Sequence, residues 1–403
     1  MKLKNNITFK NNFFNKSNKK NNKKKIFQKL NKYINRQNSP LAFLSTKNSL
    51  QLNIKKLNKF KKFKTIVILG MGGSILGTKS IYSIFEKKIK KKFIFIDNID
   101  NEKIQVINKY YRKSLFIIVS KSGETIETLI NLNALSNVIL KAENTIVITE
   151  NTNNTLNKFA IKKNIYRISH KNFIGGRYSV LTEVGMVPSF FMGLNLKNFR
   201  VNIKNILNNS LIETTNTLSK FYKNRKISSI IFLNYSPILN DLICWCQQLI
   251  AESLGKKNMG LLPVLSEGPK DHHSLLQLYL DGPKDKFVTI ISLKNKKKSR
   301  ELNCRVSKNF IYKNLHKKTM NDLLTAETIA TFETLKKKNI PIRMIELESN
   351  KEETIGSLLM HFFLETIFTC YLLEVNPFDQ PAVEEGKKLA IKYLNHGKNQ
   401  TSF

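Results

Sequence analysis

The chain has 403 residues, 41% hydrophobic and 24% charged, which is the composition of a globular protein long enough for two ordinary domains. Lys and Arg number 68 against 29 Asp and Glu, a formal net charge of +39 that could indicate a nucleic-acid or membrane partner. The excess is mostly Lys and is spread along the whole chain rather than gathered in one module, so we expect neither partner.

The first 44 residues are predicted to be a basic, low-complexity arm. Residues 1–40 are rich in Lys, Asn and Phe, and no acidic residue precedes Glu86. Such a composition predicts a solvated segment with a short helix near residues 26–34. Lys and Asn run past the length of a signal-peptide n-region without an apolar core following them, so we expect a cytoplasmic location.

Residues 45–195 are predicted to form a first α/β domain. Short β-branched and aromatic runs at 65–69, 93–96, 115–119 and 145–148 are typical of strands buried on both faces. Helical patterns lie between these runs. Strands that alternate with helices predict a doubly wound parallel sheet in a three-layer α/β/α arrangement.

Residues 196–375 repeat this alternation and predict a second α/β domain, joined to the first near residues 194–200. Strands are expected at 230–233, 287–291 and 340–345, and helices at about 240–254, 321–337 and 353–373. Residues 376–403 follow as a C-terminal segment with a helix at about 382–394. The apolar stretch 354–373 has the length of a membrane span but contains His361 and Glu365, so a buried helix is expected.

Metal and disulfide sites are not predicted. Four cysteines in a chain of this length give no disulfide framework, which is typical of a reduced cytoplasmic protein. Cys244 and Cys246 are separated by one residue and lack the spacing of a zinc site. We therefore expect neither metal nor organic cofactor.

The segment Ser120–Thr128, called here the phosphate loop, follows an expected strand directly and opens a helix. Hydroxyl groups and free backbone N–H groups would converge there, where the helix dipole also favours an anion. The alternative is an ordinary N-cap with a hydroxyl-rich first turn. The candidate phosphate-binding and substrate-binding residues of this loop are Ser120, Lys121, Ser122, Thr125 and Glu127.

Residues 70–74, called here the glycine loop, form a second glycine-rich turn from strand to helix. They lack the third glycine spacing of a dinucleotide fingerprint, although Asp97 ends the next strand where a ribose-binding carboxylate would stand. Close approach of the backbone to a sugar phosphate is the preferred interpretation, with Ser74 as a ligand.

Four segments taken together resemble the glucose-6-phosphate isomerase family in content and order. They are the phosphate loop, Gly175–Ser179, Ala251–Lys256 and Phe378–Lys387. The resemblance covers roughly residues 60–395 and implies two sugar-isomerase domains. It also implies reversible interconversion of glucose 6-phosphate and fructose 6-phosphate through a cis-enediol.

The resemblance assigns roles to five residues outside the two loops. Glu252 would be the base that moves a proton between C2 and C1, and Arg177 would stabilise the negative charge. His273, assisted by Lys387, would open the sugar ring, and Gln380 would bind the sugar. His272 stands where the family has Gln, and only one of the two adjacent histidines is expected to serve.

The family also implies a homodimer in which His273 reaches the neighbouring subunit's site. Two alternatives stay open at this point. A dual glucose and mannose phosphate isomerase shares the fold and the phosphate loop. A sugar-phosphate-sensing transcriptional regulator shares one such domain but would need a helix-turn-helix, which the N-terminal arm lacks.

Overall fold

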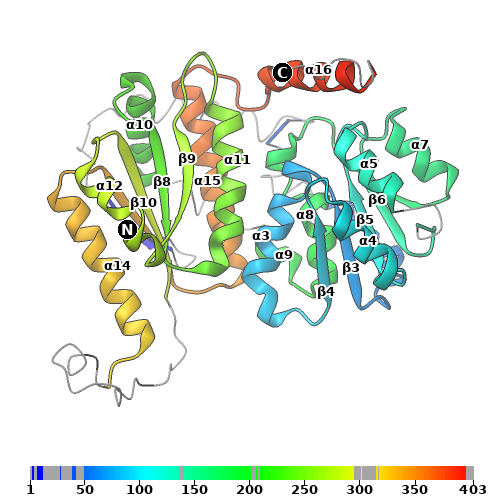
Figure 1. The fold of residues 1–403 in the computed structure, drawn as a ribbon, viewed down its shortest axis with the longest axis horizontal. Coiled ribbons are helices and arrows are strands. Elements are labelled where there is room, and N and C mark those ends of the chain that lie inside the picture. Colours follow the sequence, from blue (N-terminus) through cyan, green and yellow to red (C-terminus); the bar gives the residue numbers. More distant parts are fainter. Residues whose placement is uncertain are drawn as a thin grey trace.

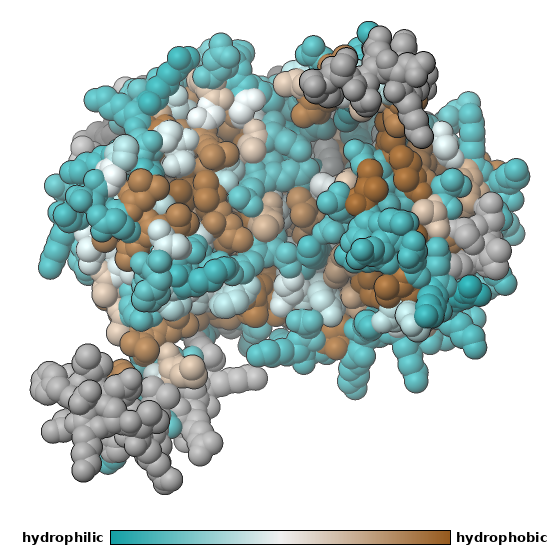
Figure 2. All heavy atoms as spheres, in the orientation of Figure 1, coloured by the Kyte–Doolittle hydropathy of each residue, from teal (hydrophilic) through white to brown (hydrophobic). Residues whose placement is uncertain are grey.

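The computed structural model describes residues 50–135, 140–200, 209–294 and 317–395, with shorter pieces at 2–3, 7–11, 28, 39–41, 206, 301 and 315. Two sheets with helices on both faces stand side by side (Figure 1). The helix expected near residues 26–34 lies outside the described residues apart from Gln28. Hydrophilic side chains are distributed over both halves of the face shown in Figure 2.

The first sheet has five parallel strands in the order β4-β3-β5-β6-β7. Their bounds are Thr65–Leu69 for β3, Lys92–Ile96 for β4, Leu115–Val119 for β5, Thr145–Thr149 for β6 and Tyr166–Ser169 for β7. The four expected strands are confirmed. Only β7 was not predicted, because this edge strand contributes the single buried residue Ile168 rather than a continuous apolar run.

Helices cover both faces of the first sheet, as expected of a three-layer unit. The helices α4 (Asn101–Tyr110), α5 (Ile126–Ala134) and α7 (Thr155–Lys162) pack through Ile104, Leu132 and Leu156 against one face. On the other face lie α3 (Leu76–Phe85) and α8 (Glu183–Phe191). The short helices α2 (Ile54–Asn58) and α9 (Leu196–Phe199) flank this unit.

The second sheet has the order β1-β2-β11-β10-β8-β9, in which β8 to β11 are parallel. Their bounds are Lys2–Leu3 for β1, Ile7–Asn11 for β2, Ser229–Asn234 for β8, Leu262–Glu267 for β9, Lys286–Leu293 for β10 and Ile342–Leu347 for β11. Strand β9 escaped prediction because it includes Pro263 and its first residue, Leu262, is exposed. Strand β2 pairs antiparallel with both β1 and β11, so the second sheet is mixed rather than purely parallel.

The N-terminal arm supplies strand β2, so the expectation of a solvated arm is wrong for these residues. Ile7–Asn11 pairs antiparallel with β11, and Ile7 and Phe9 are buried. The alternation of Ile7 and Phe9 with polar residues is the period of a half-buried strand, but the surrounding Lys and Asn content obscured it. The pairing covers the edge that β11 would otherwise expose.

The helices of the second unit are α10 (Asn209–Asn224), α11 (Asn240–Leu254), α12 (Leu276–Asp281), α14 (Met320–Lys337) and α15 (Glu352–Leu372), and α16 (Glu384–Asn395) follows them. Helix α15 lies beside α11 and α10 in the centre of the protein (Figure 1). It is the one described helix with the length and composition of a membrane span, and every residue from Thr354 to Cys370 is buried. This agrees with the expected core helix.

Helices α3 and α11 run antiparallel where the two units meet. Ser83, late in α3, donates to Asp241 at the start of α11, while Gly72, just before α3, lies against Gln248 near the end of α11. Each helix starts at the carboxyl edge of its own sheet, because each follows a strand of that sheet. The carboxyl edges of the two sheets therefore lie at opposite ends of the interface.

A buried ion pair connects β11 to α15. The Nη1 and Nη2 groups of Arg343 donate to the two carboxylate oxygens of Glu365, at 2.5 and 2.9 Å, and Nε donates to Thr289 Oγ1 at 2.9 Å. Burial would raise the pKa of Glu365, but Arg343 and the nearby His361 lower it from 4.5 to about 2. The Glu365 carboxylate is therefore charged in the core, and Arg343 is the main group that stabilises its charge.

We expect Arg343→Met to lower the free energy of unfolding by about 3–5 kcal/mol, because it leaves the Glu365 charge buried without its partner. Denaturant titration measures this change. The matched control is Lys294→Met, which breaks the pairs of a half-exposed lysine with Glu346 and Glu348 and should cost under about 1 kcal/mol.

In the wild type, the contribution of the Arg343–Glu365 pair should be present above pH 4.5 and decline as the pH falls toward 2, since the folded state holds the depressed pKa. Equal losses of unfolding free energy in Arg343→Met and in Lys294→Met would contradict the stabilising role of the buried pair.

Candidate active site

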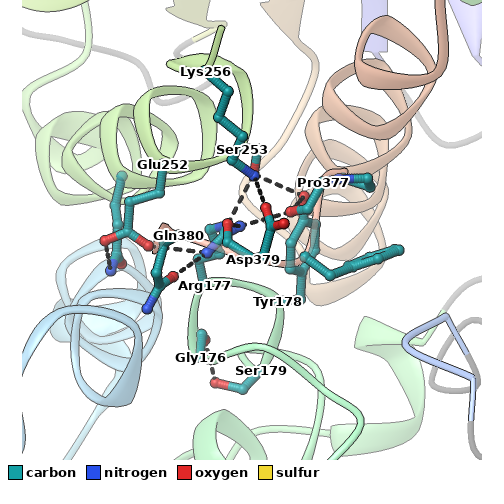
Figure 3. A network of polar contacts seen from close by, with 12 residues as sticks. Gly176, Arg177, Tyr178, Ser179, Glu252, Ser253, Lys256, Pro377, Asp379 and Gln380 are labelled. Carbon is teal, nitrogen blue, oxygen red and sulfur yellow. Dashed lines mark hydrogen bonds and ion pairs between the residues drawn. The ribbon is translucent and has the colours of Figure 1, made fainter. Parts of the chain in front are cut away.

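Arg177 is the centre of a polar network that joins three distant parts of the chain (Figure 3). It lies in a short 3-10 turn, Gly176–Tyr178, and its side chain is only 1% exposed. Its five N–H donors all have acceptors, as a buried guanidinium requires. The acceptors are Ser253 Oγ, Glu252 Oε2, Gln380 Oε1 and the carbonyl oxygens of Pro377 and Asp379.

Glu252 lies in the last turn of α11, where its carboxylate is held at both oxygens. Oε2 is 3.1 Å from Arg177 Nη1, and Oε1 accepts a hydrogen bond of 3.0 Å from Gln248 Nε2. The side chain is 31% exposed, so one of its faces is open to a bound molecule. A carboxylate fixed beside a permanent positive charge can accept a proton from a neighbouring carbon acid.

Gln248 is a site residue that the sequence analysis missed. It lies one turn before Glu252 on the same face of α11, and its amide packs against Gly72 of the glycine loop. Gly72 has φ +49°, and a Cβ there would lie 2.7 Å from Gln248 Nε2. The four-residue spacing between Gln248 and Glu252 was the available signal.

The C-terminal segment 376–380 closes one side of the site. Lys256 Nζ lies 2.6 Å from Asp379 Oδ1 and also donates to the carbonyl oxygen of Asn376. Tyr178 adds a hydrogen bond of 3.2 Å to the carbonyl oxygen of Pro377. These contacts hold the segment in place, and Arg177 donates directly to the Gln380 side chain.

The phosphate loop lies at the carboxyl end of β5, as expected. Ser120 Oγ is 3.0 Å from Thr125 Oγ1 and accepts from the backbone N–H of Gly123 at 3.2 Å. Gly123 has φ +68°, and its missing Cβ leaves room for Asn154. The turn is thus compact, with Ser122 exposed and Ser120 buried at its base.

The other predicted residues of the two loops flank this turn. Lys121 lies 3.7 Å from Glu150, Glu127 lies half-buried in the first turn of α5, and Ser74 lies half-buried at the end of the glycine loop. The two loops follow neighbouring strands, β3 and β5, with β4 on the far side of β3. This is the switch point of the sheet, where ligands of doubly wound folds bind.

The glycine loop also contacts the Arg177 turn directly. A Cβ on Gly73 would lie 2.2 Å from the carbonyl carbon of Gly176, and Ser179 Oγ donates to Gly73 O at 3.2 Å. The phosphate loop, the glycine loop, Arg177, Glu252 and Gln380 therefore converge on one side of the first sheet.

His273 is not brought to this site within the chain. It lies exposed in the turn Lys270–His273 after β9, and Asn240 at the start of α11 donates to Glu267 at the end of β9. Glu252 lies twelve residues further along α11, which at 1.5 Å per residue is about 18 Å away. The two residues lie at opposite ends of the second sheet.

Lys387 lies exposed in the first turn of α16, after residues 376–380. Among the described residues, no group of three or more His, Cys, Asp or Glu side chains is placed to hold a metal ion.

The contact between Gly73 and Gly176 gives a test of how tightly the loops pack. We expect Gly73→Ala to lower the stability by about 1–3 kcal/mol, because backbone atoms must move apart to admit the methyl group. Gly176→Ala is the control, since a Cβ there meets its nearest neighbour at 3.8 Å. Thermal unfolding of both variants measures the difference, and equal melting temperatures would show that the loops are not packed in this way.

Comparison with known proteins identifies relatives over most of the chain. The model of the phosphoglucose isomerase family matches residues 51–403. A probable glucose-6-phosphate isomerase of Methanococcus maripaludis is 31% identical over 380 residues, 90% of this chain and 86% of the relative. The glucose-6-phosphate isomerase of Campylobacter jejuni is 32% identical over 361 residues, 82% of this chain and 86% of the relative.

Solved structures agree with the fold. A hypothetical protein from Thermus thermophilus superposes with a TM-score of 0.82 at 27% identity, covering 92% of this chain and 94% of that one. A glucose-6-phosphate isomerase from Chlamydia trachomatis has a TM-score of 0.73 at 19% identity over 98% of this chain and 90% of its own, a likeness of fold alone. On the family match and the relatives, the chain belongs to the phosphoglucose isomerase family.

Proposed function

We propose that this protein is an aldose–ketose isomerase that interconverts glucose 6-phosphate and fructose 6-phosphate. The observation that carries the proposal is the Glu252 carboxylate, half-open to solvent and 3.1 Å from the buried Arg177, beside two loops at the switch point of the first sheet. The relatives named as glucose-6-phosphate isomerases support the same reaction.

The phosphate loop would hold the substrate's phosphate group. Its hydroxyls and the N–H groups at the start of α5 provide donors where the helix dipole favours an anion. Ser74 and Lys121 would add contacts from the adjoining turns, with Glu127 and Gln380 directed to the sugar hydroxyls. Anchoring the phosphate fixes C1 and C2 of the open-chain sugar relative to Glu252.

Glu252 would remove the proton from C2 of the aldose and return a proton to C1, passing through a cis-enediol. The electrons of the broken C2–H bond form the C1–C2 double bond, and those of the C1 carbonyl move to oxygen. Arg177 would stabilise that negative charge because the guanidinium stays protonated throughout. O1 gains a proton and the C2 hydroxyl loses one on the way to the ketose, so the exchange at the two oxygens balances and Glu252 accounts for the transfer between the two carbons.

His273 would open the sugar ring in a neighbouring subunit, with Lys387 acting near the ring oxygen. The support is the separation of about 18 Å along α11 between Glu252 and the end of the second sheet that carries His273. A homodimer with shared sites would bring the two residues together. We place this dimer in the cytoplasm, and Cys244, Cys246 and Cys370 are free thiols in the structure.

Replacing Glu252 by Gln tests the assignment of the base. The amide keeps the shape and a hydrogen-bond acceptor but cannot take the proton, so turnover of fructose 6-phosphate should fall at least about 10²–10⁴-fold while substrate still binds. A coupled assay of glucose 6-phosphate formation measures turnover. Glu333→Gln, a surface substitution on α14, should retain full activity. Near-normal turnover in Glu252→Gln would rule out Glu252 as the base.

Mixing two inactive variants tests the shared site. Subunits with Glu252→Gln and subunits with His273→Ala should regain activity after exchange, because a hybrid dimer has one site with both changes and one site with neither. Native mass spectrometry confirms that hybrids have formed. The proposal predicts that a fully hybrid dimer has about half of the wild-type activity. Hybrids without activity would place both residues in one chain's site.

A further inference from the structure

His272 and His273 are adjacent in the sequence but turn to different sides of the chain. His273 is exposed, whereas the His272 ring enters the second unit, where its Nε2 lies 2.5 Å from Tyr235 Oη and 3.2 Å from Thr331 Oγ1. The hydroxyl of Tyr235 donates in turn to Thr331 Oγ1 at 2.8 Å. These three polar groups form a closed triangle of hydrogen bonds. His272 comes from the turn after β9, Tyr235 directly follows β8, and Thr331 lies in α14.

The direction of these hydrogen bonds defines what position 272 supplies. Tyr235 Oη donates to Thr331 Oγ1, so its oxygen can accept, and the His272 tautomer that carries its proton on Nε2 supplies the matching donor. Tyr235 and Thr331 are 1% and 6% exposed, so water cannot replace that donor readily. A Gln side chain, which the family resemblance gives for this position, also carries an N–H donor at its end.

Asp271 connects the turn that carries both histidines, residues 268–274, to the end of β9, but not to Tyr235 or α14. The carboxylate of Asp271 accepts from Ser266 Oγ at 2.9 Å, from the backbone N–H of Glu267 at 2.7 Å and from Ser274 Oγ at 3.0 Å. Gly268 lies against the Tyr235 ring, since a Cβ there would lie 2.7 Å from it. Within the part of the chain that the structure describes, His272 is the only side chain of the Lys270–His273 turn with hydrogen bonds to Tyr235 and Thr331.

We propose that His272 is a positioning residue for His273. Its imidazole anchors the turn to Tyr235 and Thr331, so that the next residue projects outward in one fixed orientation. The inference rests on the proposed function, because His273 has a task only if it opens the sugar ring. It adds a role to a residue that sequence reasoning set aside in favour of its neighbour.

Loss of the His272 anchor should slow ring opening and leave the affinity for the phosphate ligand unchanged. Ring opening followed by closure exchanges the α and β anomers of glucose 6-phosphate and needs no proton transfer by Glu252. Anomer exchange in the Glu252→Gln protein, followed by NMR exchange spectroscopy, therefore isolates the step that His273 performs. Binding of 6-phosphogluconate, an open-chain sugar acid phosphate, reports on the phosphate loop and on folding without ring opening.

The experiment compares four changes made in the Glu252→Gln protein. His272→Ala and Tyr235→Phe should slow anomer exchange, the former by about 10–100-fold because the His273 turn loses its anchor. His272→Gln restores the N–H donor and should keep exchange within about threefold of the parent. Lys270→Ala removes an exposed pair with Glu267 in the same turn and should have no effect. Affinity for 6-phosphogluconate should be unchanged in all four.

Three results would overturn the inference while leaving the proposed function intact. The first is anomer exchange in His272→Ala equal to that of the parent, and the second is exchange as slow in His272→Gln as in His272→Ala. A parallel loss of 6-phosphogluconate affinity and exchange would indicate a purely structural role and also contradict it. A parent protein that neither binds 6-phosphogluconate nor exchanges anomers would contradict the proposed function, and the inference with it.

Discussion

The candidate site depends on one buried guanidinium. Arg177 reaches its five acceptors only because the first unit, the end of α11 and the C-terminal segment all meet around it. A buried cation with an unmet donor costs several kcal/mol, so each of these parts holds the others in place. The same charge lies 3.1 Å from Glu252, which couples the packing of the site to its chemistry.

The second constraint is the antiparallel packing of α3 against α11. Because each helix starts at the carboxyl edge of its sheet, the first unit presents its switch point to the far end of α11, where Glu252 lies. The first unit therefore contributes the phosphate loop from the carboxyl edge of its sheet. The second unit contributes the Glu252 carboxylate from the edge opposite to its own carboxyl edge. The same geometry directs the turn with His272 and His273 away from Glu252.

Sequence reasoning was most successful where burial is complete. Strands such as Leu115–Val119 are buried at every position, so their apolar runs are unmistakable, and α15 was recognised because His361 and Glu365 interrupt an otherwise membrane-like helix. Strands β7 and β2 were missed because few of their residues are buried and these do not form a continuous apolar run. In β2 the buried Ile7 and Phe9 alternate with polar residues inside a Lys-rich and Asn-rich segment.

The site was predictable in its charged and hydroxyl groups but not in its supporting contacts. Short motifs indicated Arg177, Glu252 and the phosphate loop, since these are local in sequence. Gln248 was missed because its role arises from contact with Gly72, which lies far away in the chain. The hydrogen bonds of His272 to Tyr235 and Thr331 are equally long-range and could be found only in the folded structure.

The central claim is that Glu252 transfers a proton at C2 of a sugar phosphate, and isomerisation in deuterated water tests it most directly. NMR spectra of glucose 6-phosphate incubated with the protein in D₂O follow the ketose formed and the hydrogen retained at C2. The account predicts fructose 6-phosphate formation together with deuterium entering C2 of the remaining aldose, because the carboxylate exchanges its proton with solvent between turnovers. Isomerisation through many turnovers with complete retention of the original hydrogen would contradict it.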